Sequence, residues 1–184
     1  MKRIFLLMGA LLLLGSVASA SSTTLKWTAG WDNFGEPLNY KKSKIKYSVD
    51  PAKSSLAVTF TLVGANPNKL YQVGINFFCT TFPATFGNYP TAPGGGACQS
   101  ITRQGVTAAV AAVELGVVTT DEHGNGSFKV TIGSIASGTY VVEFQTRNGV
   151  GCNLIGGAGN GADCSDDFQS PGPTFGDSTT ITIP

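Results

Sequence analysis

The sequence predicts an all-β sandwich, and two observations lead to this fold class. First, apolar and polar residues alternate in several short runs; in Leu56–Leu62, for example, every second residue is a large apolar one and the others are Ala or Thr. Period-two alternation is typical of a strand that buries one face. Second, clusters of Gly, Pro, Asn and Asp separate these runs at the spacing expected of a sandwich or barrel.

The first twenty residues are expected to form a cleaved signal peptide, followed by a single domain over residues 21–184. Two basic residues precede an apolar run at 4–14 that is short for a membrane span, and Ala18-Ser19-Ala20 provides a small-residue cleavage site. A retained N-terminal anchor is the alternative. No other long apolar run follows. We therefore expect a mature chain that has no membrane span and is secreted, either extracellular or periplasmic.

The mature chain is expected to be close to electrically neutral. Cleavage of the signal peptide removes Lys2 and Arg3, which reduces the 12 basic residues to 10, against 11 acidic residues. Nucleic-acid recognition needs clustered Lys and Arg to neutralise phosphates, so this balance argues against a nucleic-acid partner. The one basic cluster, Lys41 to Lys46, alternates in its second half with Ile45 and Tyr47. We interpret it as the exposed face of a strand.

The four cysteines are expected to form two disulfides, because an even number of cysteines in an exported chain usually pairs. Three pairings are possible. We favour Cys79–Cys98 and Cys152–Cys164, because each pair encloses a Gly-rich segment with little strand pattern. A loop of this size stabilises a fold by about 3 kcal/mol in the chain-entropy model. A metal site is disfavoured, since the chain has no Cys-x-x-Cys and a single His.

Most of the expected strands follow from alternation alone. Outside the central stretch they are 25–28, 45–49, 56–62, 71–77 and 179–183. The second, third and fourth of these are predicted to form an antiparallel meander, because only short turns join them. The run 106–115 fits a helix by its Ala content and a strand by its alternation, and the strands on either side favour a strand.

The central stretch, Val117–Thr146, is expected to contain a hairpin and a third strand. Residues 127–132 and 140–145 each place a large apolar residue at every second position, so each is predicted to bury one face. Between the first two strands, Asn125-Gly126 supplies the pair with positive φ that a tight hairpin turn needs.

Three aromatic residues near the mature N-terminus, Trp27, Trp31 and Phe34, are expected to cover one open end of the core. Buried aromatics supply much of the core of a small domain. The alternative is an aromatic platform for a sugar ring or an apolar ligand.

The two loops closed by the predicted disulfides are the candidate binding surface. The segment 80–97 is long, irregular and Pro-rich, and its aromatic residues are not accompanied by charges. Such a loop either shapes a binding surface or covers the end of the sandwich. The candidate ligand-binding residues on the two loops are Phe82, Phe86, Tyr89, Leu154 and Ile155.

The densest acidic group of the chain is a candidate calcium site. Carboxylate and amide oxygens on a Gly-rich loop are suitable Ca²⁺ ligands. Their spacing does not match an EF-hand loop, so a solvated loop is the alternative. The candidate ligands are Asn160, Asp163, Asp166 and Asp167.

No constellation in the sequence indicates catalysis. His123 is the single histidine and lies in a turn beside Gly124, where we expect it to be solvated rather than part of a catalytic triad. The acids Glu114 and Glu143 lie in strands and have no pattern that pairs them across a cleft. We expect no enzymatic activity and no cofactor.

The order of these features resembles a known family. Tyr71-x-Val73 leads into Cys79, a second cysteine follows in Ala97-Cys98, and Asp121 and Gly124-Asn125-Gly126 mark a turn; a further strand leads to Cys152 and Cys164, and a Gly-Pro segment precedes the last Thr-Ile strand. Over about residues 55–183 this layout resembles the neocarzinostatin-like apoproteins. The resemblance implies a secreted immunoglobulin-like sandwich with two local disulfides and an apolar ligand held in a cleft.

The sequence thus predicts an immunoglobulin-like Greek-key β-sandwich of about seven to nine strands with two disulfides. The expected function is that of a secreted, non-catalytic binding module whose disulfide-tied loops contact a small molecule, a carbohydrate or a protein surface. The alternative is a structural or adhesive extracellular protein. A concave apolar pocket between the loops would favour the first hypothesis, and a flat face with an open edge strand would favour the second.

Overall fold

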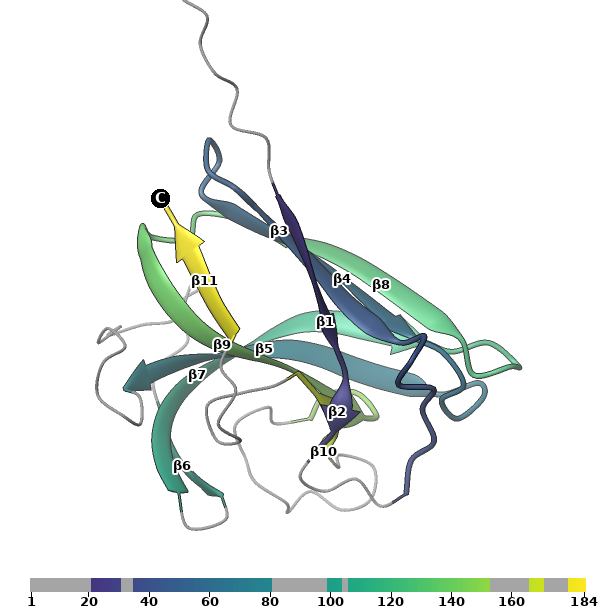
Figure 1. Ribbon diagram of the computed structural model, residues 1–184. Helices are drawn as coiled ribbons and strands as arrows, with labels where there is room; N and C mark the ends of the chain where they lie inside the picture. The colour runs from purple at the N-terminus through teal and green to yellow at the C-terminus, as the bar shows by residue number, and fades with distance from the viewer. Residues whose placement is uncertain (1–20, 31–34, 81–98, 104–105, 153–165, 171–178) are drawn as a thin grey trace, which may run out of the picture.

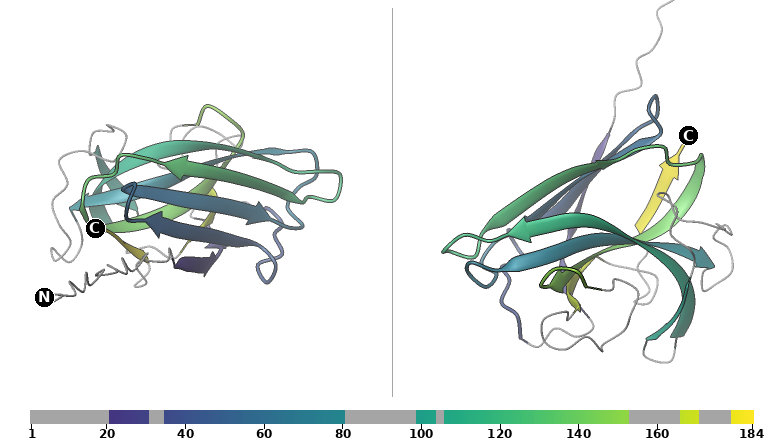
Figure 2. Two further views of the ribbon diagram at one scale, coloured as in Figure 1. Left: turned by 90° about the horizontal axis from the view of Figure 1, so that it is seen from above. Right: turned by 180° about the vertical axis from the view of Figure 1, so that it is seen from behind.

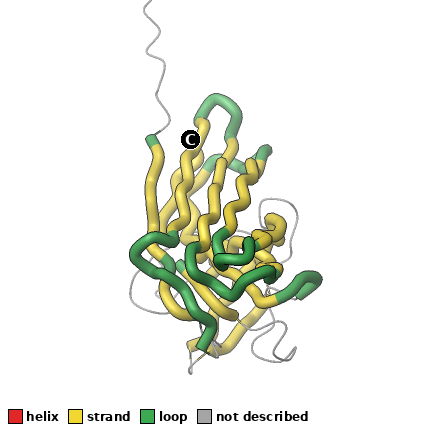
Figure 3. Tube along the Cα trace, turned by 90° about the vertical axis from the view of Figure 1, so that its right-hand side faces the viewer, coloured by secondary structure: helices red, strands yellow, loops and turns green. Residues whose placement is uncertain are grey.

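The computed structural model describes residues 21–30, 35–80, 99–103, 106–152, 166–170 and 179–184, and these contain strands and loops but no helix (Figure 3). The strands are β1 (Ser22–Lys26), β2 (Thr28–Ala29), β3 (Lys44–Asp50), β4 (Ser55–Leu62), β5 (Leu70–Thr80), β6 (Gln99–Arg103), β7 (Val106–Thr119), β8 (Gly126–Ile132), β9 (Gly138–Asn148), β10 (Asp166–Gln169) and β11 (Thr179–Ile183). The expectation of an all-β chain is confirmed.

The strands form two antiparallel sheets that lie one over the other (Figures 1 and 2). The four-stranded sheet has the order β1-β3-β4-β8. The seven-stranded sheet has the order β2-β10-β9-β5-β7-β6, and β11 pairs with β9 beside it. Each sheet also pairs strands that are distant in the sequence, such as β4 with β8 and β5 with β9, so the chain passes between the layers several times.

The core between the sheets is rich in aromatic rings. Phe60 of β4 meets Phe144 of β9 edge to face, with 5.9 Å between the ring centroids, and both side chains are fully buried. Tyr47 lies against the other side of Phe144 at 5.9 Å. Such pairs contribute about 0.5–1.5 kcal/mol each beyond the burial of their area. The inward positions of β3, β4 and β5 are those that the alternation predicted.

The predicted strand at 25–28 is interrupted at Trp27. β1 ends before this residue and pairs with β3, whereas β2 begins after it and pairs with β10 in the other sheet. The Trp27 side chain is 2% exposed, stacks on Phe60 and donates its indole N–H to the Thr61 carbonyl at 3.2 Å. A buried indole therefore marks the change of sheet, and the expectation that Trp27 belongs to the core is confirmed. The other two residues of the predicted group, Trp31 and Phe34, lie outside the described residues.

The predicted meander of three strands is only partly correct. β3 and β4 pair as expected, but β5 pairs with β7 and β9 in the other sheet. The connection Val63–Lys69 makes this crossing. The Val63 carbonyl accepts the N–H of Asn39 at 2.8 Å, and the N–H of Ala65 donates to the Gly124 carbonyl at 3.0 Å. Contacts to distant segments, rather than the length of the turn, direct β5 away from β4.

A turn forms at 121–126 where it was predicted, but Gly124 and not the Asn125-Gly126 pair has the positive φ, and the turn does not close a hairpin. The Asp121 N–H donates to the Asn125 carbonyl at 2.8 Å, yet β7 pairs with β5 while β8 pairs with β4, so the turn joins two sheets. Gly124 has a φ of +74°, and a Cβ on it would lie 1.9 Å from the Ala65 carbonyl oxygen. The turn therefore packs directly against the connection between β4 and β5.

β9 is buried on both faces, and the prediction of one buried face is wrong for this strand. Its inward residues join the core, and the residues on its opposite face are also at most 2% exposed: Val141, Glu143, Gln145 and Arg147. β9 pairs with β5 along one edge and with β11 and β10 along the other. A strand at the centre of a covered sheet is buried on both sides. Its alternation separates an apolar buried face from a mainly polar buried face.

Two further findings concern the run 106–115 and the number of strands. The run 106–115 belongs to β7, a strand of 14 residues, so the strand interpretation is confirmed. The described residues hold eleven strands rather than seven to nine. Two of the additional strands are short. β2 has two residues, and the four-residue β10 lies where the sequence indicated a loop. Short strands of this kind depend on pairing with neighbours and carry little pattern of their own.

Candidate functional site

Most of the sequence-predicted site residues cannot be placed. Those outside the described residues are Phe82, Phe86, Tyr89, Leu154, Ile155, Asn160, Asp163, Cys98 and Cys164. Asp166 and Asp167 belong to the strand β10, where the sequence indicated a loop. Neither Cys79 nor Cys152 is a free thiol. Within the described ranges, no three His, Cys, Asp or Glu side chains gather closely enough to hold a metal ion.

The described residues do present one extended surface, the outer face of the four-stranded sheet. We call it the lysine face and define it by the outward residues of β1, β3, β4 and β8: Ser22, Thr24, Lys26, Lys44, Lys46, Ser48, Asp50, Ser55, Ala57, Thr59, Thr61, Ser127, Lys129 and Thr131. The inward residues of the same strands face the core. All four lysines are exposed. The four strands lie side by side above the other sheet (Figure 2).

The strand register fixes how the lysines are spaced. Lys26 lies directly opposite Lys44, while Lys46 and Lys129 face Thr59 from its two sides. Neighbouring strands are about 4.8 Å apart, so Lys46 and Lys129 stand roughly 10 Å apart at their Cα atoms. Lys44 and Lys46 are separated by about 7 Å along β3. The face is therefore a grid of ammonium groups with hydroxyl groups between them.

The lysine face carries one acidic residue against its four lysines. Asp50 is the last residue of β3, opposite Ser55 of β4, and its carboxylate binds Lys53 at 3.1 Å. The hydrogen bond from the Lys53 side chain holds the pKa of Asp50 below its ordinary value. The single carboxylate of the face is therefore paired with a turn lysine at one end of β3.

Folding alone does not explain this arrangement. Like charges directly opposite one another, as in the Lys26–Lys44 pair, destabilise a sheet. Lysines on edge strands prevent edge-to-edge aggregation, which accounts for Lys26 on β1 and Lys129 on β8. Lys44 and Lys46 lie on β3, which is paired on both sides. Both are exposed on the outward face of that strand.

A shallow hollow lies within the lysine face. It has a volume of about 240 Å³ and is lined by Ser22, Lys46, Tyr47, Ser48, Ala57, Thr59 and Lys129. The lining combines two ammonium groups with hydroxyl groups. Ammonium groups donate charge-assisted hydrogen bonds to anionic oxygens, and hydroxyl groups donate or accept. The hollow is therefore suited to an anionic group that also carries hydroxyls.

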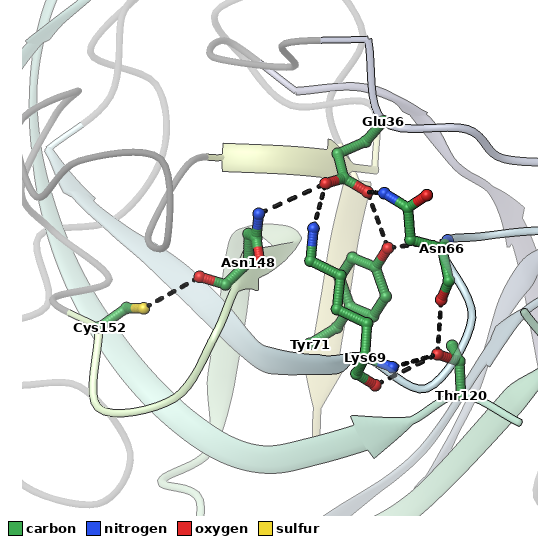
Figure 4. A network of polar contacts seen from close by, with 7 residues as sticks. All are labelled: Glu36, Asn66, Lys69, Tyr71, Thr120, Asn148 and Cys152. Atoms are coloured by element: carbon green, nitrogen blue, oxygen red, sulfur yellow. Dashed lines mark hydrogen bonds and ion pairs between the residues drawn. The ribbon is translucent and has the colours of Figure 1, made fainter.

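A second polar cluster, around Glu36, ties the chain together away from the lysine face (Figure 4). One carboxylate oxygen accepts from the Lys69 ammonium and from Asn148 Nδ2 at 3.3 Å. The other accepts from Asn66 Nδ2 at 2.6 Å and from the Tyr71 hydroxyl at 2.8 Å. The Glu36 side chain is only 9% exposed. With four donors on two oxygens, it is a structural anchor and not an available base.

The Glu36 cluster also reaches the crossing between the two sheets. The Lys69 N–H donates to Thr120 Oγ1 at 2.9 Å, and this hydroxyl donates to the Asn66 carbonyl at 2.7 Å. Nearby, the sulfur of Cys152 lies 3.6 Å from the Asn148 carbonyl oxygen (Figure 4). The sequence analysis missed Glu36, because its partners are far from it in the chain.

A third polar group lies on the outward side of the seven-stranded sheet and is fully buried. Asn76 Nδ2 donates to Glu143 Oε1 at 3.3 Å, and Gln145 Nε2 donates to Asn76 Oδ1 at 3.2 Å. Gln72 makes two hydrogen bonds with the backbone of Cys152, at 2.8 and 2.9 Å. These side chains are at most 2% exposed, so they act within the fold rather than as an open surface.

The two strand acids named in the sequence analysis do not form a pair. Glu143 is buried, Glu114 is exposed, and β5 lies between their strands. His123 is exposed in its turn, 3.8 Å from Glu122. In the part of the chain that the structure describes, no helix is long and apolar enough to cross a membrane.

Comparison with known proteins adds little to this description. No protein-family model matches the chain, and no curated protein matches it. One solved structure, from work on pH-induced modulation of Streptococcus parasanguinis adhesion by Fap1 fimbriae, aligns with 84% of this chain and 96% of that chain. The two share 13% sequence identity, and the TM-score is 0.31. A likeness at this level carries no argument about fold or function here.

Proposed function

We propose that the mature chain is a secreted, non-catalytic binding module that attaches to an anionic macromolecule through the lysine face. The observation that carries this proposal is the group of four exposed lysines on one sheet face, where the one acidic residue, Asp50, is paired with Lys53. A chain that is nearly neutral as a whole places these charges together. Clustered charge of one sign attracts and orients an oppositely charged partner.

The proposal includes finer features of the molecule. Export follows from the signal-peptide pattern in residues 1–20, and two disulfides, Cys79–Cys98 and Cys152–Cys164, would stabilise the exported domain. The two sheets and the crossings between them support an immunoglobulin-like Greek-key arrangement. The loops that carry Phe82, Phe86 and Tyr89 would form a second contact surface.

A non-catalytic role is supported by the state of the acid and base groups. The Glu36 carboxylate is saturated by donors, and Glu143 is bonded to the Asn76 amide. General acid–base catalysis needs a group that can reach the substrate and exchange a proton. His123 is exposed in a turn beside Glu122, with no nucleophile among its described contacts.

The second candidate function is a structural or adhesive role through edge strands. β1 and β8 are the outer strands of the four-stranded sheet, and in the described residues each pairs on one side only. An edge of this kind can pair with another chain. Lys26 and Lys129 stand on these strands and oppose such pairing, so we place binding through the face first.

The test is binding of the oxidised mature protein to immobilised carboxylated and uncharged surfaces at several salt concentrations. We expect retention on the carboxylated surface only, with binding that weakens as salt rises. The double variant K44Q/K46Q removes two charges from the face, and K41Q/K42Q removes two from the exposed turn before β3. Loss of retention in the first variant alone supports the proposal. Equal loss in both, or retention on neither surface, would contradict it.

A further inference from the structure

We propose that the anionic partner is an acidic polysaccharide, a polymer of sugar rings that carry carboxylate or sulfate groups. This inference rests on the proposed function and deepens it. Four features of the lysine face support it: the spacing of its charges, the size and lining of its hollow, its lack of apolar and aromatic anchors, and its lack of arginine.

The hollow is too small for a complete ligand. Pockets for drug-sized molecules have volumes of about 300–1,000 Å³, and the hollow, at about 240 Å³, is smaller and lies on an otherwise open sheet face. Lysines continue beyond it, at Lys44 and Lys26. A partner that places one charged group in the hollow must extend across the face to meet them. A linear polymer with repeated charges satisfies this requirement.

The lining of the hollow suits a sugar that bears an anion. Lys46 and Lys129 supply ammonium groups from two sides, while Ser22, Ser48 and Thr59 supply hydroxyl groups. Sugar rings present many hydroxyls, each of which both donates and accepts hydrogen bonds. Serine and threonine hydroxyls match this chemistry, because they also donate and accept. A partner with charge but no hydroxyls would use only part of this lining.

Other anionic partners fit the face less well. Binding at a membrane surface needs apolar side chains that insert, and the outward residues of the face contain no apolar side chain larger than Ala57. The exposed large hydrophobic residues of the described chain, Tyr40, Leu70 and Val150, lie elsewhere. A second copy of the chain would bring like charges together.

Nucleic acids are disfavoured on the same grounds. Single-stranded nucleic acids bind through aromatic rings on which bases stack. Tyr47, the one aromatic residue that lines the hollow, packs its ring against Phe144 inside the core. Arginine, which binds phosphate with two parallel hydrogen bonds, is absent from the lysine face.

The experiment measures binding of the full mature protein to four probes at low salt. These are polygalacturonate, a neutral glucan of similar length, duplex DNA, and vesicles that contain phosphatidylserine. We expect polygalacturonate to bind at least about tenfold more tightly than DNA or the vesicles, with an affinity that falls as salt rises. The neutral glucan should not bind.

Variants assign the effect to the hollow. K46Q/K129Q should weaken polygalacturonate binding by about tenfold or more, while K41Q/K42Q, with the same loss of charge, should change it less than twofold. T59V, which replaces the hydroxyl with a methyl group, should weaken it by about fivefold. Thermal unfolding of each variant verifies that it is folded.

The outcomes separate the two proposals. Binding of DNA or of vesicles as tight as that of polygalacturonate overturns the polysaccharide but leaves an anion-binding face. An unchanged affinity in K46Q/K129Q overturns the site. If none of the three anionic probes binds, the proposed function itself fails.

Discussion

Removal of the Glu36 carboxylate should destabilise the fold by about 3–5 kcal/mol, which is the usual cost of breaking a buried ion pair by deleting one partner. The side chain is 9% exposed and its partner Lys69 is 25% exposed, so solvent offers little compensation. Glu36→Ala leaves the Lys69 ammonium, the Tyr71 hydroxyl and two amides without their acceptor. Each lost hydrogen bond to a charged group costs about 1.5–3 kcal/mol, offset in part by water that enters the site.

The assay is urea unfolding of the oxidised mature protein, followed by tryptophan fluorescence. For a domain of this size, a loss of 1 kcal/mol lowers the melting temperature by about 2–4 °C, so thermal unfolding gives an independent check. Lys69→Met should also destabilise the fold. The double variant Glu36→Ala with Lys69→Met removes both charges, and its cost should be smaller than the sum of the single costs by about 1–3 kcal/mol.

Two results would refute the reasoning about Glu36. A cost below about 1 kcal/mol for Glu36→Ala would place the carboxylate in the class of surface ion pairs. Additive costs in the double variant would show that Glu36 and Lys69 do not act together. The matched control is Glu122→Ala, an exposed carboxylate in a turn, which should change stability by no more than about 0.5 kcal/mol.

Three further predictions concern the turns and the core. Gly124→Ala should lower the free energy of unfolding by about 2 kcal/mol or more, because its φ is +74° and a Cβ would collide with the Ala65 carbonyl. Urea unfolding measures this loss. An unchanged stability would contradict the close packing of the 121–126 turn against the connection between β4 and β5. The backbone N–H of Asn125, and next that of His123, hold the pKa of Asp121 below its ordinary value, although partial desolvation opposes them. A carboxylate whose pKa is lower in the folded state than in the unfolded state stabilises the fold above the unfolded-state pKa, and this stability is lost as pH falls through the folded-state pKa. Acid should therefore lower the free energy of unfolding of the wild type more than that of Asp121→Asn. Equal losses in the two proteins on acid titration would contradict this. Phe60→Ala should cost about 3–5 kcal/mol, since the ring is fully buried between Trp27 and Phe144, whereas Thr131→Ala on the exposed face should cost less than about 0.5 kcal/mol; calorimetry of both variants decides.

The strands were predictable from local pattern, but their partners were not. Alternation in 56–62 and 71–77 correctly gave the inward residues of β4 and β5. The same alternation could not show that β5 joins a different sheet, because that choice depends on contacts of Val63–Lys69 with segments far along the chain. Sheet pairing is non-local, so a short turn is weak information about which strands meet.

In the candidate site, too, the local pattern was predictable from the sequence, whereas the grouping of distant residues was not. The cluster from Lys41 to Lys46 was predicted to be the exposed face of a strand; this is correct for Lys44 and Lys46 of β3, whereas Lys41 and Lys42 lie in the turn before it. Lys26 and Lys129 belong to strands distant in the sequence, and the register alone brings them into one face with Lys44 and Lys46. The charge of the whole chain concealed this grouping, because acidic residues elsewhere balance it.

The pairing of β2 with β10 has a consequence for how the chain reaches its native state. Thr28 Oγ1 donates to the Gln169 carbonyl at 2.9 Å, across a separation of 141 residues. β9 likewise acquires its second neighbours only when β10 and β11 arrive. A nascent chain therefore lacks β10 and β11 until residues 166–183 have been synthesised. Folding that depends on such non-local contacts is slow.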